Sequence, residues 1–126
     1  MDYQGKRIGI IGYGVNNAEL VPYLQERGAH VTILDKKPDI VVPSGVESVL
    51  GEHYLDNITN FDLLFRSPGL PFLTPQLQAA QAAGVIITSQ TQLFLEECPC
   101  RIIAVTGTKG KGTTSSLIKS MLDIAH

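Results

Sequence analysis

The chain of 126 residues contains no tryptophan, four tyrosines and four phenylalanines, so aromatic side chains contribute little to its interior. Val, Ile, Leu and Ala must therefore form most of the core, which is usual for a parallel sheet that helices cover on both faces. The length suits one ordinary domain and not comfortably two.

The sequence also lacks a strong excess of charge and long apolar runs. Its net charge of −2 gives no reason to expect nucleic acid or an anionic membrane as a partner. No apolar run approaches the roughly 18 residues needed to cross a bilayer. The segment Met1–Arg7 is polar, unlike a secretory signal. We therefore expect a cytoplasmic protein.

Cysteine is scarce, and the two that occur, Cys98 and Cys100, are separated by one proline. Two residues apart on an extended segment, they are badly placed to bridge each other. A metal site would need further ligands, and His30, His53 and His126 are scattered along the chain. We interpret both cysteines as reduced thiols.

Short apolar runs alternate with helix-like stretches over the first three quarters of the chain. We expect strands at Arg7–Ile11, His30–Leu34, near Val46–Leu50, at Leu63–Arg66 and at Val85–Thr88, and helices at about Asn17–Arg27, Pro75–Ala83 and about Thr91–Glu97. Parallel neighbours need crossover connections, usually helical and right-handed. The pattern therefore predicts an α/β fold with a doubly wound, Rossmann-like parallel sheet.

A new unit is expected after Pro99, with a strand at Arg101–Thr106, a glycine loop and a helix from about Lys111 to Ala125. The helix carries one apolar stripe, formed by Leu117, Ile118, Met121, Leu122 and Ala125. One strand and one helix cannot bury this stripe. We expect it to lie back on the first domain or to exchange between two copies in a dimer.

The first loop with chemical character is Gly12-Tyr13-Gly14, which follows a strand and precedes a helix. Glycines there allow the backbone to approach a phosphate, and the free amides at the helix start supply donors. Asp35 ends the second strand at the distance, about 20 residues, at which an acid binds a ribose in dinucleotide-binding folds. Asn17 occupies the position of the third glycine of that fingerprint, so the identity of the nucleotide stays open.

The second loop follows the expected strand at Arg101–Thr106 and contains Gly110-Lys111. Its backbone amides would surround phosphates while the Lys111 ammonium reaches the β/γ oxygens. Gly112 stands where Ser or Thr normally holds Mg²⁺. Thr113 or Thr114 is a candidate for that role after a shift of one residue.

At these two loops the sequence resembles the Mur ligase family, and the resemblance runs over nearly the whole chain. Its most specific piece is Ile103–Lys111, which is similar to the ATP-loop signature of the family. The Ile11–Gly14 loop, Asp35, the Ser67–Gly69 turn and Leu93-Phe94 support it. The similarity is greatest to the members that add D-glutamate to UDP-N-acetylmuramoyl-L-alanine in peptidoglycan synthesis.

The resemblance implies that residues 1–96 form a UDP-substrate-binding domain and that residues 97–126 begin a truncated, ATP-binding central domain. The implied UDP site consists of Gly14, Val15, Asn16 and Asn17 at the diphosphate, Asp35, Lys36 and Lys37 at the uracil and ribose, and Ser67, Pro68 and Gly69 in the same crevice. The implied ATP site consists of Gly107, Thr108, Lys109, Gly110, Lys111, Gly112 and Thr113, with Lys111 catalytic and Thr113 a ligand of Mg²⁺.

The family forms an amide from ATP, a substrate carboxylate and, in these members, D-glutamate. We expect this piece to bind the UDP moiety and to be inactive alone. Two alternatives remain open. One is an NAD(P)-binding domain of an oxidoreductase or NAD-sensing regulator, for which Lys36 and Lys37 would suit a phosphorylated ribose. The other is a non-enzymatic interaction module whose exposed C-terminal helix pairs with a partner.

Overall fold

The computed structural model describes residues 1–125, with the side chain of Asn16 excepted. Its contacts divide the chain into two compact units, Met1–Glu96 and the segment from Glu97 onward. No helix in the described residues combines the length and the apolar character that a membrane crossing requires.

The first unit is built on a sheet of five parallel strands in the order β3-β2-β1-β4-β5. The strands are β1 (Arg7–Ile11), β2 (His30–Asp35), β3 (Glu47–Leu50), β4 (Leu63–Arg66) and β5 (Ile86–Thr88). The chain proceeds outward from β1 through β2 to β3, and then crosses to the other side of β1 for β4 and β5. The switch point between β1 and β4 is where open parallel sheets bind ligands, at the carboxyl ends of the strands.

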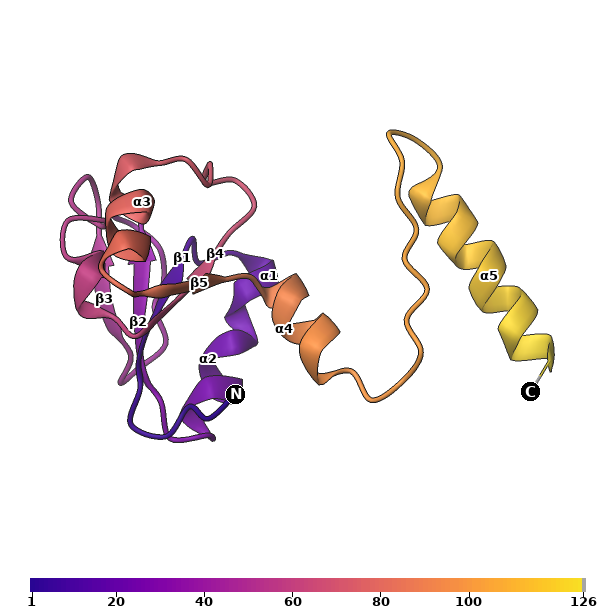
Figure 1. Cartoon of the computed structure of the whole chain (residues 1–126), viewed down its shortest axis with the longest axis horizontal. Helices are drawn as coiled ribbons and strands as arrows, with labels where there is room; N and C mark the ends of the chain where they lie inside the picture. The colour runs from indigo at the N-terminus through magenta and orange to yellow at the C-terminus, as the bar shows by residue number, and fades with distance from the viewer. Residues whose placement is uncertain (126) are drawn as a thin grey trace. The chain divides into compact units, whose positions relative to one another are not determined.

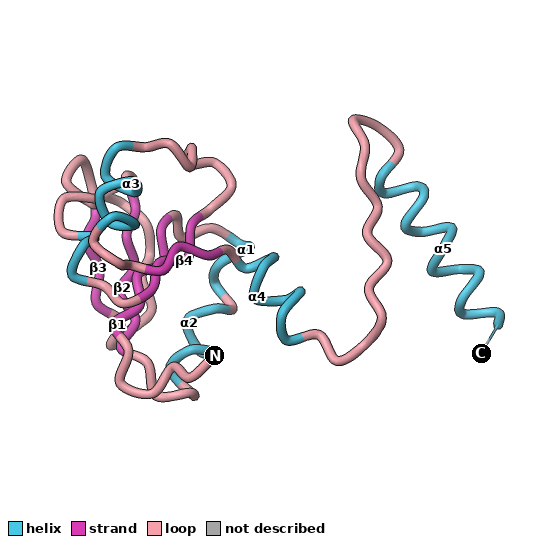
Figure 2. The backbone as a smooth tube through the Cα atoms, in the orientation of Figure 1, coloured by secondary structure: helices cyan, strands magenta, loops and turns pink. Residues whose placement is uncertain are grey.

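Helices cover both faces of this sheet, as the backbone traces in Figures 1 and 2 show. They are α1 (Val15–Ala18), α2 (Leu20–Gln25), the 3-10 helix η1 (Ile58–Asn60), α3 (Pro75–Ala82) and α4 (Gln90–Glu97). One core cluster joins α2 and α4 to one face of the strands, and a second joins η1 and α3 to the opposite face. The predicted α/β, doubly wound parallel sheet is confirmed.

The alternation of side chains along each strand explains the two clusters. On β1, Ile8 and Ile10 enter the first cluster and Ile11 enters the second. On β4, Phe65 enters the first cluster and Leu64 the second. Because both faces are buried, these strands read as continuous apolar runs instead of alternating ones.

The helix expected at Asn17–Arg27 is wrong in one respect, because it is broken at Glu19 into α1 and α2. Pro22 accounts for the break. It has no N–H to donate to the carbonyl of Ala18, and its ring crowds that carbonyl. The interruption puts Pro22 in the first turn of α2, where proline is tolerated.

The connection from β2 to β3 contains no helix within residues 36–46, although a parallel pair usually has a helical crossover. Apolar side chains of this connection, Ile40, Val42 and Val46, pack against the first core cluster instead. They cover the part of the sheet face that a helix would otherwise cover.

The second unit contains α5 (Lys111–Ala125), as predicted, but the strand expected at Arg101–Thr106 is wrong, since these residues form irregular backbone. A strand needs a neighbour that pairs with its N–H and C=O groups. None of the described residues supplies a neighbouring strand there. Within this unit the apolar stripe of α5 is exposed at Leu117, Met121 and Leu122.

We predict that Leu77→Ala in α3 destabilises the first unit by about 2–5 kcal/mol, because Leu77 is fully buried and its loss leaves a cavity. The matched control is Leu73→Ala, since Leu73 is 78% exposed and should change stability by less than about 0.5 kcal/mol. Urea unfolding followed by circular dichroism measures both. Equal effects of the two variants would contradict the described position of α3.

Candidate functional site

The glycine loop after β1 contains two glycines with different physical requirements. Gly12 has a φ of +82°, and a Cβ there would lie 2.7 Å from Oγ of Ser67. Gly14 has an ordinary extended conformation, with φ −116°, and a Cβ there would meet no atom within 4 Å. The fold therefore requires glycine at position 12, whereas position 14 faces open space.

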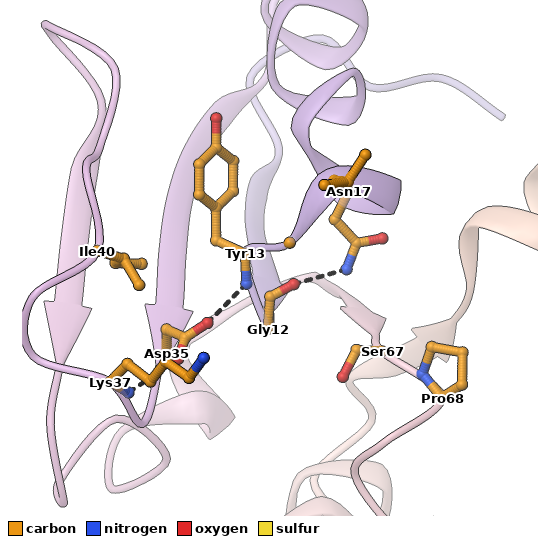
Figure 3. Close-up of a pocket in the computed structure, with 10 residues that line it drawn as sticks. Gly12, Tyr13, Asn17, Asp35, Lys37, Ile40, Ser67 and Pro68 are labelled. Atoms are coloured by element: carbon orange, nitrogen blue, oxygen red, sulfur yellow. Dashed lines mark hydrogen bonds between the residues drawn. The ribbon is translucent and has the colours of Figure 1, made fainter.

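Asp35 joins the glycine loop to the loop after β2. Its Oδ2 accepts a hydrogen bond from the backbone N–H of Tyr13, and its Oδ1 accepts one from the N–H of Lys37, both at 2.8 Å (Figure 3). The backbone N–H of Gly12 also donates to the carbonyl of Leu34 at 2.8 Å. A carboxylate has about four acceptor positions, so Asp35 keeps capacity for a ligand while it holds both loops.

Asn17 closes the glycine loop from the helix side. Its side chain is buried, and Nδ2 donates a hydrogen bond of 2.8 Å to the carbonyl of Gly12 (Figure 3). The backbone N–H of Asn17 donates to the carbonyl of Gly14. The residue that replaces the third glycine of the fingerprint thus stabilises the loop. A further contact of Asn17 with a ligand stays a prediction.

The turn after β4 forms the opposite wall. Arg66 organises it, because its guanidinium donates hydrogen bonds to the carbonyls of Ser67 and Leu70. The N–H of Leu70 donates to the carbonyl of Ser67 at 3.2 Å, and the N–H of Ser67 donates to Ile11 at 3.1 Å. These bonds place the Ser67 side chain against Gly12.

Two pockets adjoin these loops at the carboxyl edge of the sheet. The main pocket, of about 330 Å³, is lined by Gly12, Tyr13, Gly14, Val15, Asn17, Asp35, Lys37, Ile40, Ser67 and Pro68 (Figure 3). The Tyr54 pocket, of about 170 Å³, is lined by Ile11, Gly12, Asp35, Lys36, Tyr54, Ser67, Gly69 and Leu70. Gly12, Asp35 and Ser67 belong to both.

The structure thus brings together most residues of the implied UDP site. Seven of them line the main pocket, and Lys36 and Gly69 line the Tyr54 pocket. The side chain of Asn16 lies outside the described residues. Sequence reasoning missed Tyr13, Ile40 and Tyr54. Ile40 lies in the irregular connection between β2 and β3, and Tyr54 lies in the turns between β3 and η1, where no motif marks them.

The surroundings of the Tyr54 phenol change its pKa. Partial burial raises its pKa above the ordinary 10.0, and the negative charge of Asp35 raises it further. Tyr54 is therefore a neutral hydrogen-bond donor beside a carboxylate at physiological pH.

The glycine loop of the second unit leads directly into α5. Gly107 and Gly110 have positive φ values of 151° and 78°, and the helix begins at Lys111. The Lys111 ammonium donates to the carbonyl of Gly107 at 2.5 Å. This loop has the glycines, lysine and helix start of a phosphate-binding loop, while ATP binding stays a prediction.

A metal site is not apparent in the part of the chain that the structure describes, since it brings no three His, Cys, Asp or Glu side chains together as ligands. The Mg²⁺ role of Thr113 in the first turn of α5 stays a prediction. So does the exchange of α5 between two copies, which no contact of the described residues supports.

A comparison with known protein families identifies the family to which this site belongs. Residues 6–89 match the model of the N-terminal domain of MurD-like Mur ligases. The chain belongs to the Mur ligase family. The match covers the glycine loop, Asp35 and the Ser67 turn, so both pockets lie within the family domain.

Curated relatives support the assignment to Mur ligases. UDP-N-acetylmuramoylalanine–D-glutamate ligase of Acetivibrio thermocellus is 39% identical over 94% of this chain and 27% of its own length. The enzymes of that name from Clostridium novyi and from Clostridium botulinum strain Loch Maree are 35% and 37% identical, over 94% and 93% of this chain and 28% and 27% of their own lengths. The chain thus spans about a quarter of the length of these relatives. Among solved structures, an epimerase of Methanothermobacter thermautotrophicus overlaps 50% of this chain and 22% of its own, at 27% identity and a TM-score of 0.42.

We predict that Gly12→Ala destabilises the first unit by at least about 1–2 kcal/mol, because an L side chain is strained at positive φ and its Cβ would collide with Ser67. Gly14→Ala, the matched control, should change stability by less than about 0.5 kcal/mol. Urea unfolding of the two variants distinguishes them. Similar losses in both would show that position 14 is also required by the fold.

We also predict that an alkaline titration followed by tyrosinate absorbance contains a component from Tyr54 that ionises above the ordinary pKa of 10.0. The folded pKa of Tyr54 lies above the unfolded value, so its contribution to stability is complete below about pH 10 and is lost as the pH rises through the folded pKa. Tyr54→Phe should remove the late component. An unchanged late component in that variant would assign it to another tyrosine.

Proposed function

We propose that this chain is the N-terminal part of an ATP-dependent ligase that joins D-glutamate to UDP-N-acetylmuramoyl-L-alanine in peptidoglycan synthesis in the cytoplasm. Within it, the first unit binds the UDP moiety. The observation that carries the proposal is the main pocket at the sheet's switch point, with Gly14 facing open space, inside the region that matches the family. The enzymes to which the chain is similar supply the substrate class.

The diphosphate fits the glycine-loop end of the main pocket. The amides of Gly12 and Tyr13 are used within the fold, as donors to Leu34 and Asp35. The amides of Gly14 and Val15 donate to no protein acceptor among the described contacts, and both residues line the pocket. Lys37 lines the same pocket and adds a positive charge. Free amides and a cation form a suitable environment for phosphate oxygens.

The second unit is proposed to begin the ATP-binding domain. Lys111 and the amides of residues 108–113 would contact the ATP phosphates. An oxygen of the substrate carboxylate attacks the γ-phosphorus, ADP leaves with the bonding electron pair, and an acyl phosphate results. The amine nitrogen of D-glutamate then attacks the acyl carbon, phosphate leaves, and the nitrogen loses a proton. Lys111 would stabilise the charge on the transferring phosphoryl group.

Magnesium would lower the barrier by neutralising charge on the ATP phosphates. The described residues offer a hydroxyl at Thr113 and no cluster of carboxylates, and Gly112 cannot supply a ligand atom from a side chain. They therefore do not form a complete magnesium site.

The proposal includes inactivity of the chain alone, because it spans about a quarter of the length of the relatives. The family match favours a uridine nucleotide over the alternative NAD(P) site. It equally favours a ligase over an interaction module formed by α5. The NAD(P) alternative gives a different result in a titration with NADH.

We predict that UDP binds saturably in calorimetric titration and that NADH does not. Gly14→Ala should weaken UDP binding at least about tenfold, roughly 1.4 kcal/mol, because the new methyl group occupies the space of a phosphate. Val41→Ala, at an exposed residue outside both pockets, should bind like the wild type.

Three results would contradict the proposal. Tight binding of NADH without a response to UDP would assign the chain to the NAD(P) class. Wild-type affinity in Gly14→Ala would move the UDP site away from the glycine loop. Amide formation from ATP, D-glutamate and the UDP-linked substrate by the 126-residue chain would contradict its inactivity.

A further inference from the structure

The sequence from Ser67 to Leu95 contains no Lys, Arg, Asp, Glu or His, although 17% of the whole chain is Lys, Arg, Asp or Glu. This uncharged segment comprises the turn after β4, α3, β5 and most of α4. Many of its side chains are exposed, among them the glutamines Gln76, Gln78, Gln81 and Gln92. The lack of charge is therefore a property of the surface as well as of the core.

The two edges of the sheet differ in charge. The outermost strands are β3 and β5. At the first edge, Glu47 begins β3 and Glu52 follows it, and both are exposed. Charged side chains at a sheet edge oppose pairing with another chain. The edge at β5 lies within the uncharged segment and lacks this protection.

The outer edge of β5 presents the backbone groups of Ile87. The N–H of Ile86 donates to the carbonyl of Asp62, just before β4, at 3.2 Å, so the N–H and C=O of Ile86 face β4. Successive residues of a strand direct these groups to alternate sides. The N–H and C=O of Ile87 therefore face away from β4, where none of the described strands pairs with them.

Exposed apolar side chains accompany this edge on one face of the sheet. Ile86 is paired with Leu63, a member of the first core cluster, so the exposed Ile86 side chain points to the face of that cluster. β5 leads directly into α4 (Figure 1), whose Leu93 enters the same cluster. Phe94 and Leu95, next to it on α4, are exposed.

We propose that the β5 edge is a self-association surface, on which β5 pairs antiparallel with β5 of a second copy of this chain. With a twofold axis at Ile87, each Ile87 exchanges two N–H···O=C bonds with its counterpart. The axis is perpendicular to the sheet, so the exposed apolar side chains of both copies come to the same face of the joined sheet. This inference goes beyond the proposed function and does not depend on nucleotide binding.

Charge is the reason for choosing a second copy as the occupant. A twofold interface places a surface against the same surface of the partner. Any charge near the axis then meets an identical charge, which is unfavourable. The uncharged segment avoids this repulsion at β5, whereas Glu47 would cause it at β3. Because β5 has three residues, we expect weak, concentration-dependent association.

The test is sedimentation velocity of the full chain over a range of concentrations, which should show a monomer–dimer equilibrium. Ile86→Lys changes an exposed side chain and puts like charges near the axis, so it should weaken dimerisation at least about tenfold. Val49→Lys, the matched control, puts the same charge at an exposed position of β3 and should leave dimerisation unchanged.

Ile87→Pro tests the backbone pairing. Proline removes the N–H that faces outward and leaves the bonds of Ile86 to β4 intact, a position at which edge strands tolerate proline. We expect this variant to be monomeric, with its fold checked by circular dichroism. Ile86→Lys decides the question if Ile87→Pro fails to fold.

A wild type that stays monomeric at all concentrations would overturn the proposal. If the Ile87 amide of that monomer were protected from hydrogen exchange, another segment of the chain would be the occupant. A dimer that neither β5 variant weakens would also overturn it, and its loss in Met121→Lys would assign association to the apolar stripe of α5.

The outcome is separable from the proposed function. Ile86 lines neither the main pocket nor the Tyr54 pocket. Ile86→Lys should therefore bind UDP like the wild type in calorimetric titration while it dimerises more weakly. Loss of UDP binding in Ile86→Lys would show that the variant disturbs more than the edge, and Ile87→Pro then decides.

Discussion

The Asp35 carboxylate connects the ends of two neighbouring strands through the N–H groups of Tyr13 and Lys37, both at 2.8 Å. These two bonds hold the glycine loop and the loop after β2 in fixed relation. Because Gly12 is also pressed against Ser67, the turn after β4 is coupled to the same point. The shape of both pockets therefore depends on the side chain of Asp35 and on the presence of glycine at position 12.

The polar groups around the two pockets form two sets. One set is hydrogen-bonded within the fold, and the other lies at the pocket walls. Asn17 and the amides of Gly12 and Tyr13 are engaged within the fold. Gly14, Val15 and the two lysines after Asp35 are at pocket walls instead. In a nucleotide-binding loop, groups of the first kind keep the second kind in position before the ligand arrives, which lowers the entropy lost on binding.

The two units differ in whether their extended segments pair with neighbouring strands and in whether their apolar side chains are covered. In the first unit, each strand has a parallel neighbour and both sheet faces are covered. In the second, residues 101–106 have the apolar, branched composition of a strand but no neighbour among the described residues. Propensity alone does not form a strand, because most of its stability comes from pairing and packing.

Local pattern was sufficient for the strands of the first unit, for α5 and for the glycine loops, because periodicity, chain-turning glycines and apolar runs act over a few residues. Leu63–Arg66, for example, is a strand with the predicted bounds. The break at Glu19 follows from Pro22. The proline is a local signal, but it does not by itself decide whether the helix continues with a kink or stops and restarts. Membership of the Mur ligase family was also evident from the residues around the two loops.

Only the tertiary structure decided which polar groups meet. The sequence by itself determined that Asp35 ends a strand, but its use as an acceptor for two loops depends on the register of β1 against β2. Tyr54 lies in a stretch without periodicity, so no local rule connects it with Lys36 or Ser67. Residues far apart in sequence become neighbours through strand order and through the direction of irregular connections. Both are set by the packing of the whole sheet and not by the residues themselves.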